Sequence, residues 1–268
     1  GLGGAGFPTD VKLQPKQQVD TLLINASECE VWLTSDTQEM LNCSDDIIRG
    51  IKAVLQYTGI PKCVIGIENN KPECIDLLCK KTSGDSAIEV KPLPSVYGTG
   101  AELILIEKCL GREVPHGGLP ADAGAIVMNV TSVSTLGKYL TTGMPVVERT
   151  ITVDGDACAK PQNIVVPVGT SYQDIIDFAG VKGGVTLGKV VAGGAMMGPA
   201  VQDRPLRGVL PHGSGACGGQ SGLRCTRCAG AGQAACRLLL QLRQLLLRLP
   251  GKAPGDPDDE PGKGILPR

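Results

Sequence analysis

Apolar residues between position 20 and about position 140 form short continuous runs and longer segments in which they recur every three or four residues. The runs are typical of strands buried on both faces of a parallel sheet, and they comprise residues 20–26, 62–67, 88–93 and 125–130. The longer segments have the spacing of helices packed by one face, and they comprise residues 44–57, 71–80 and 100–110. Strand and helix therefore alternate as in βαβ units, which predicts an α/β fold with a parallel sheet.

A different pattern follows this region. Residues 146–156 alternate polar and apolar positions and end in a turn, and residues 163–170 predict a second strand. Residues 172–178 have the pattern of a short helix. This strand–turn–strand–helix order predicts a small α+β module, which ends at the glycine-rich segment 193–198.

The composition changes near residue 200. Lysine outnumbers arginine by 13 to 3 in residues 1–200, whereas arginine outnumbers lysine by 8 to 2 in residues 201–268. All seven aromatic residues precede residue 180. The last segment is rich in Gly, Pro, Arg and Leu and lacks the aromatic residues that help to build a core. We expect it to be disordered or poorly packed.

Charge and hydropathy exclude two classes of protein. The formal net charge of −1 lacks the basic excess of a nucleic-acid-binding protein, so no nucleic acid is expected as a partner. The sequence contains no apolar run of 18 or more residues, so none of its segments is predicted to span a bilayer.

The chain has eleven cysteines, most of them single residues within apolar segments. A reduced cysteine in such a place behaves as a small hydrophobic residue, and we expect this of Cys63, Cys74, Cys79 and Cys109. Only Cys225 and Cys228 form a C-x-x-C pair and are candidate metal ligands. A bacterial iron–sulfur motif would require further cysteines at positions 231 and 235, and both positions hold alanine, so the cluster motif is damaged.

A glycine-rich segment opens the sequence. Gly3 and Gly4 precede Phe7, and Lys12 follows within a predicted helix start. Glycines without Cβ let backbone N–H groups approach phosphate oxygens, and a nearby lysine adds positive charge. These residues are therefore candidate cofactor ligands, although the same glycines could form only a tight turn.

Carboxylate and amide side chains follow the ends of three predicted strands. Glu28 and Glu30 follow the first strand, Asn129 ends the fourth, and a glycine turn at Gly100 places Glu102 at a helix start. Open α/β sheets bind ligands at this edge, where carboxylates could bind ribose hydroxyls or set the field around a redox ring. The alternatives are solvated loop carboxylates for Glu28 and Glu30 and a favourable first-turn acid for Glu102.

The two histidines offer no catalytic arrangement. Neither His116 nor His212 lies near a serine or cysteine in a pattern that would suggest a nucleophile and its base, so hydrolase chemistry has little support.

Six strings occur in a fixed order along residues 1 to about 200: GLGGAGFPTDVK, INASECE, YGTGAE, GREVPHGGLPADAGAIVMNV, ITVDGD and GGAMMG. Together they resemble the RnfC family, the C subunits of electron transport complexes. That family is related to the flavin- and NADH-binding subunit of respiratory complex I. The resemblance implies that further residues precede Gly1 in the whole protein.

The resemblance implies three parts: an FMN- and NADH-binding Rossmann-like domain over 1–143, a β-grasp (SLBB) module over 144–198, and an atypical tail over 199–268. In the family this last region carries two ferredoxin-type [4Fe–4S] clusters. The residues that the resemblance places around FMN are Gly3, Gly4, Lys12, Asn25, Gly100 and Asn129. Those that it places toward the nicotinamide nucleotide are Phe7, Glu30 and Glu102.

The sequence departs from the family at several positions. Ser27 stands where the complex I relatives have an aspartate that contacts flavin, and Ala101 stands where they have a glutamate. Val31 and Trp32 replace a Pro-Tyr pair. We interpret the altered composition after residue 200 and the damaged cysteine motif as the product of a shifted reading frame, which translation of the other frames would test.

The expected function is that of a flavin-dependent electron-transfer subunit. It would accept hydride from NADH onto FMN and pass electrons to a membrane-bound, ion-translocating oxidoreductase complex. Its partners would be the other subunits, with ferredoxin or a flavoprotein subunit, and it would be cytoplasmic and peripheral on the inner face of the cell membrane. Two alternatives remain open: a cobalamin reductase of the propanediol-utilisation type, and a non-catalytic docking subunit.

Overall fold

A computed structural model describes Leu2, residues 7–28, 30–196, 198 and 200–201, and the backbone of 222–227. All of these residues belong to one compact unit, which covers residues 1–228. The prediction of a disordered tail, and the reading-frame hypothesis, concern residues that lie almost entirely outside this description.

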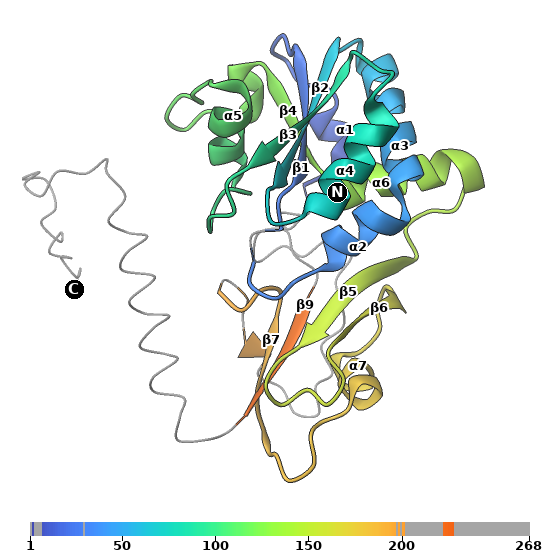
Figure 1. Ribbon diagram of the computed structural model, residues 1–268, viewed down its shortest axis with the longest axis vertical. Coiled ribbons are helices and arrows are strands. Elements are labelled where there is room, and N and C mark those ends of the chain that lie inside the picture. Colours follow the sequence, from blue (N-terminus) through green and yellow to red (C-terminus); the bar gives the residue numbers. More distant parts are fainter. Residues whose placement is uncertain are drawn as a thin grey trace, which may run out of the picture. The chain divides into compact units, whose positions relative to one another are not determined.

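A four-stranded parallel sheet forms the first part of the chain (Figure 1). Its strands are β1 (Thr21–Ala26), β2 (Lys62–Glu68), β3 (Ile88–Leu93) and β4 (Ala125–Asn129), in the order β3-β2-β1-β4. The central strands are almost wholly buried, because helices cover both faces of a sheet built from βαβ units. The predicted α/β fold with a parallel sheet is confirmed.

Alternate residues of each strand supply two separate hydrophobic layers. Leu22, Ile24 and Ile65 face the helices α2 (Ser35–Asn42), α3 (Ser44–Thr58), α4 (Pro72–Thr82) and α6 (Val130–Thr142). Leu23 and Val64 face α5 (Glu102–Leu110) and a 3-10 turn, η1 (Pro120–Ala123). A short helix, α1 (Thr9–Lys12), precedes β1. The period of two along the strands therefore divides the core between the two faces.

Helices α3 and α6 approach one another through two glycines. A Cβ atom on Gly50 would overlap the carbonyl oxygen of Val133, and one on Gly137 would overlap the carbonyl oxygen of Asp46. The two helix backbones can therefore lie this close only because both positions lack a side chain.

A second, mixed sheet follows. Its strands are β5 (Glu148–Asp154), β6 (Gln162–Pro167), β7 (Leu187–Ala192), β8 (Ala200–Val201) and β9 (Gly222–Arg227), in the order β6-β5-β9-β7-β8. Helix α7 (Tyr172–Ala179) packs on it through Tyr172, Ile175 and Ile176. The β5–β6 hairpin and α7 agree with the predicted α+β module, whereas its assignment as a β-grasp (SLBB) module stays a prediction.

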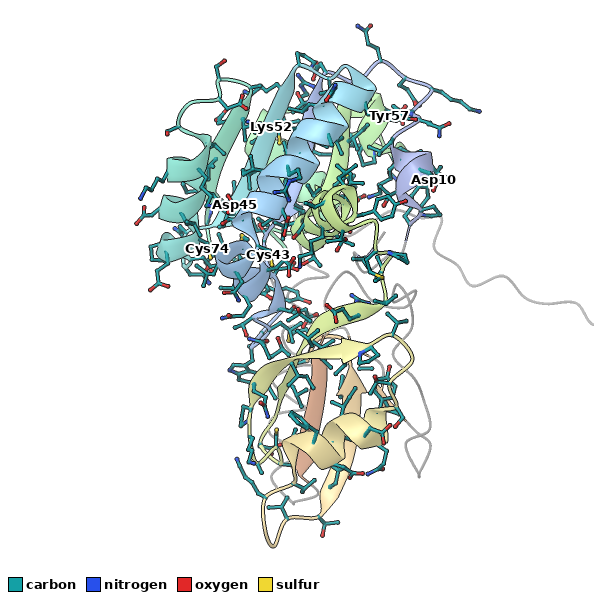
Figure 2. The ribbon with its side chains drawn as sticks, turned by 90° about the vertical axis from the view of Figure 1, so that its right-hand side faces the viewer. Asp10, Cys43, Asp45, Lys52, Tyr57 and Cys74 are labelled. Atoms are coloured by element: carbon teal, nitrogen blue, oxygen red, sulfur yellow. The ribbon has the colours of Figure 1, made fainter. Side chains whose placement is uncertain are left out.

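Several elements differ from the expectation. Helices α2 and α6 and strand β7 were not predicted, and the fourth strand ends at Asn129 because α6 begins at the next residue. Cys79 is exposed on α4, which corrects the expectation that it is a core residue. Cys74, labelled in Figure 2, is buried as expected, and so are Cys63 and Cys109. No helix among the described residues has the length and apolar character needed to cross a membrane.

Candidate functional site

The carboxyl ends of β1 and β4 lie next to each other, because Asn25 is paired in register with Asn129. The loops that follow β1 and β3, together with α1, meet at this edge through side-chain contacts. The predicted site residues that these contacts bring together are Lys12, Asn25, Gly100, Glu102 and Asn129. The expected convergence of the strand-end segments is therefore present. We refer to this region as the strand-end edge.

Asn25 joins β1 to the glycine turn before α5. Its side-chain amide donates to the carbonyl oxygen of Gly100 at 2.7 Å, and its side-chain oxygen accepts from the backbone N–H of Ser27 at 3.1 Å. The amide is satisfied in both directions, so it fixes the end of β1 relative to the turn.

Lys12 joins α1 to the same edge. Its Nζ donates to Glu102 Oε1 at 2.6 Å and to the carbonyl oxygen of Val127 at 3.0 Å, and it lies 5.9 Å from the centre of the Phe7 ring. Phe7 is exposed. Glu102 is the first residue of α5, as the first-turn interpretation also predicted. Because Glu102 already balances the lysine charge, an anion bound here would compete with that carboxylate.

Asn129 has a structural task at the start of α6. Its side-chain oxygen accepts from the backbone N–H groups of Thr131 at 3.0 Å and Ser132 at 3.3 Å, which is an N-cap. Its amide nitrogen donates to Asp36 Oδ2 at 2.9 Å. The residue therefore links β4, α6 and α2.

Glu28 and Glu30 are both buried, so the interpretation of them as solvated loop carboxylates is wrong. The Glu28 carboxylate accepts from the backbone N–H groups of Asp36 at 2.8 Å and Thr37 at 3.3 Å, and from the Thr37 hydroxyl at 2.6 Å. It thus occupies the N-terminus of α2, where a negative charge is favoured. Contact of Glu28 with a cofactor stays a prediction.

Asp36 lies in the same buried group. Burial raises its pKa to about 7, and the neighbouring Glu28 carboxylate contributes to the increase. The Thr131 hydroxyl donates to its Oδ1 at 2.6 Å, which partly offsets the cost of the buried charge. On the other side, burial lowers the pKa of the nearby Arg149 guanidinium.

Glu30 lies between two loops. Its Oε2 accepts from the backbone N–H of Met196, at 3.1 Å, and its Oε1 accepts from the Tyr97 hydroxyl at 3.5 Å. Met196 belongs to the segment 193–198 after β7, so a residue predicted to face the nicotinamide is in contact with the second sheet's module.

Ser27 provides the observation that points to a ligand. Its Oγ is buried and has no hydrogen-bond partner among the residues that the structure describes. Buried hydroxyl groups are normally satisfied, so an unpartnered one at a ligand-binding edge is available to a polar group of a bound molecule. The isoalloxazine and ribityl groups of FMN carry such polar atoms, so the residues present fit FMN.

Some predicted residues cannot be placed. Gly3, Gly4 and Cys228 lie outside the described residues, as does His212, and of Cys225 only the backbone on β9 is described. His116 is exposed. The described part of the chain contains no group of three or more His, Cys, Asp or Glu side chains that could hold a metal ion.

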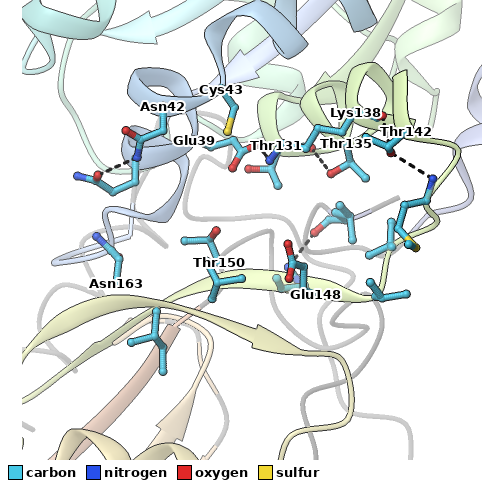
Figure 3. A pocket seen from close by; sticks show the side chains of 18 of the residues that line it. Glu39, Asn42, Cys43, Thr131, Thr135, Lys138, Thr142, Glu148, Thr150 and Asn163 are labelled. Atoms are coloured by element: carbon cyan, nitrogen blue, oxygen red, sulfur yellow. Dashed lines mark hydrogen bonds and ion pairs between the residues drawn. The ribbon is translucent and has the colours of Figure 1, made fainter. Parts of the chain in front are cut away.

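A hollow of about 670 Å³ lies between α2, α6 and the β5–β6 hairpin (Figure 3). One wall consists of α6 residues at helical spacing, namely Thr131, Thr135, Lys138 and Thr142. Opposite them is Glu39, whose carboxylate pairs with Lys138 at 2.8 Å. The described residues of the predicted cofactor site do not line this hollow. Sequence analysis missed it because it did not predict α2 and α6, although the polar spacing on α6 was a usable signal.

Residues 1–138 match the family model described as "Nuo51 FMN-binding domain". The chain therefore belongs to the Nuo51 FMN-binding domain family. The air-oxidized NAD+-reducing [NiFe]-hydrogenase has a similar fold, with a TM-score of 0.67 over 84% of this chain and 44% of that one at 18% identity. This structural likeness confirms the Rossmann-like α/β architecture.

Three curated relatives are more specific, and all are C subunits of ion-translocating complexes. The chain is 38% identical over 243 residues to that of the proton-translocating ferredoxin:NAD(+) oxidoreductase complex of Clostridium ljungdahlii, covering 86% of this chain and 52% of that protein. It is 42% identical over 200 residues to the Na(+)-translocating counterpart of Acetobacterium woodii, covering 74% and 45%. It is 38% identical over 199 residues to that of the ion-translocating oxidoreductase complex of Vibrio cholerae, covering 74% and 26%.

These relatives confirm the resemblance to the RnfC family that the ordered motifs predicted. The chain spans about half the length of the first two relatives and about a quarter of the third.

Proposed function

We propose that this chain holds FMN at the strand-end edge and oxidises NADH there, as the flavin-bearing part of an ion-translocating electron transport complex. The observation that carries this proposal is the unpartnered, buried Ser27 Oγ at an edge where Lys12, Asn25 and Gly100 already meet. The family match to an FMN-binding domain over the same residues supports it.

The residues of the edge would divide the work. Lys12, with Gly3 and Gly4, would hold the phosphate, and Ser27 would meet a polar group of the flavin. Asn25, Gly100 and Asn129 would set the spacing between the loops through the hydrogen bonds already formed. When bound, FMN would supply the redox chemistry, because it accepts two electrons together and releases them one at a time.

The exposed Phe7 and the carboxylates of Glu30 and Glu102 would face the nicotinamide nucleotide. Phe7 offers an apolar ring for stacking, and the carboxylates suit ribose hydroxyls. The electrons would then go to other subunits of a membrane-bound complex, with ferredoxin or a flavoprotein subunit as a further partner, and the chain would lie on the inner membrane face. The chain alone, without intact cluster motifs, would perform only the first half of this reaction.

The experiment is anaerobic reduction of the flavin-loaded chain. The full 268-residue chain, incubated with FMN and freed of excess ligand, is expected to remain yellow and to lose its visible absorbance when NADH is added. NADPH at the same concentration serves as the matched comparison. A chain that retains FMN but is not bleached by NADH would contradict the NADH step. A chain that retains no FMN would favour a docking subunit.

A further inference from the structure

The segment 193–198 after β7 is built around the Glu30 carboxylate. A Cβ atom on Gly194 would overlap the carboxyl group of Glu30, so only glycine leaves room for that side chain. Two positions later, the backbone N–H of Met196 donates to Glu30 Oε2 at 3.1 Å. The turn therefore supplies both the space and a hydrogen-bond donor for the carboxylate.

The two other glycines of the segment shape this turn. Gly193 has a φ of +93°, which side chains rarely adopt. The N–H of Gly198 donates to the carbonyl oxygen of Gly194 at 2.7 Å and closes the turn. A Cβ atom on Gly198 would overlap that same carbonyl oxygen. Each glycine of the string GGAMMG thus has a physical reason, and one of those reasons is Glu30.

The same module also holds the other end of the loop that carries Glu30. The Thr34 N–H donates to Thr152 Oγ1 at 3.1 Å, and Asn163 Nδ2 donates to Thr34 Oγ1 at 2.8 Å. Between these attachments lies Trp32, whose φ of +65° is a strained conformation for a residue with a side chain. Such a conformation persists where the surrounding structure fixes the chain, and here the loop is fixed at both ends.

We propose that the turn 193–198 is a positioning element for Glu30, so that the second module helps to set how the nicotinamide nucleotide binds. Gly194 and the Met196 N–H would be positioning groups, since they act through Glu30 and not on the substrate. This inference rests on the proposed function for its consequence at the substrate. The contact between the turn and Glu30 stands on geometry alone.

The first test is a double-mutant cycle on the flavin-free full chain, measured by thermal unfolding. We expect Gly194→Ala to lower the melting temperature by about 4 °C or more, because the methyl group displaces a buried carboxylate. Gly183→Ala is the matched control, since a Cβ atom there meets nothing within 4 Å. In a Glu30→Ala background the effect of Gly194→Ala should fall to less than half. An undiminished effect in that background would overturn the proposed seat for Glu30.

The second test uses the flavin-loaded chain. Gly194→Ala is expected to raise the KM for NADH about tenfold while kcat changes less than about twofold. A purely structural role would lower the active fraction, and therefore kcat, and leave KM unchanged; that result would overturn the positioning role. If the unsubstituted chain binds no FMN, the proposed function and this positioning role both fail. The unfolding cycle still decides separately whether the turn holds Glu30.

Discussion

Buried carboxylates are the main feature of the site at the scale of single residues. The spacing along the chain correctly predicted that acids and amides follow the strands. It gave no partners for them, because those partners come from elements far away in sequence: Asp36 on α2 for Asn129, and Met196 after β7 for Glu30. Glu28 was predicted to meet a cofactor, and its carboxylate is found at the N-terminus of α2, a helix that the apolar pattern did not predict.

The raised pKa of Asp36 has a consequence for stability. Its pKa of about 7 in the folded protein lies above the value of about 4 expected in the unfolded chain. The folded state therefore binds this proton more tightly, and the contribution of Asp36 to the free energy of unfolding decreases as the pH rises from about 4 to about 7. Above that range the folded protein bears the full cost of the buried charge.

Asp36→Asn removes this charge and keeps groups that can bond to Asn129 and Thr131. We expect the variant to exceed the unsubstituted chain in free energy of unfolding by roughly 1 to 3 kcal/mol at pH 8, with little difference at pH 4. Urea unfolding at the two pH values measures this. Asp76→Asn, at an exposed position of α4, is the control and should change neither. A variant less stable at pH 8 than at pH 4, relative to the unsubstituted chain, would contradict the account.

Contrast in the apolar pattern decided what could be predicted at the scale of elements. The four strands of the first sheet and α3, α4 and α5 have uninterrupted or regularly spaced apolar residues, and all seven were predicted. Helix α6 begins directly at Asn129 and carries many threonines and serines, so its pattern was weak. Helix α2 has few apolar residues, and its place depends on Glu28 and Asn129, which local sequence does not show.

The α3–α6 contact gives a prediction at this scale. Alanine is favoured over glycine inside a helix by about 1 kcal/mol. At Gly137 the new methyl group would overlap the backbone of α3 at Asp46, and two helices must move apart. We expect Gly137→Ala to be destabilising by about 1 to 3 kcal/mol net, measured by urea unfolding. Gly84→Ala, where a Cβ atom meets nothing within 4 Å, is the control. Equal or greater stability of Gly137→Ala would show that the helices are not held this close.

The α/β domain and the second module share the loop between β1 and α2 at the scale of the whole molecule. Glu30 contacts the segment after β7, and Thr34 contacts β5 and β6. Sequence patterns predicted both parts but not this contact, because hydrogen bonds between residues more than a hundred positions apart leave no local signal. The acidic loop of the proposed cofactor site is thus held from both sides.

The central claim is that the strand-end edge binds FMN through its phosphate and ring. Equilibrium titration of the full chain with FMN, followed by flavin fluorescence, tests it most directly. We expect saturable binding, a Kd about tenfold weaker for Lys12→Met, and an unchanged Kd for Lys16→Met, a nearby exposed lysine. Riboflavin, which lacks the phosphate, should not distinguish Lys12→Met from the unsubstituted chain. Absence of saturable FMN binding, or equal losses for the two lysine variants, would contradict the claim.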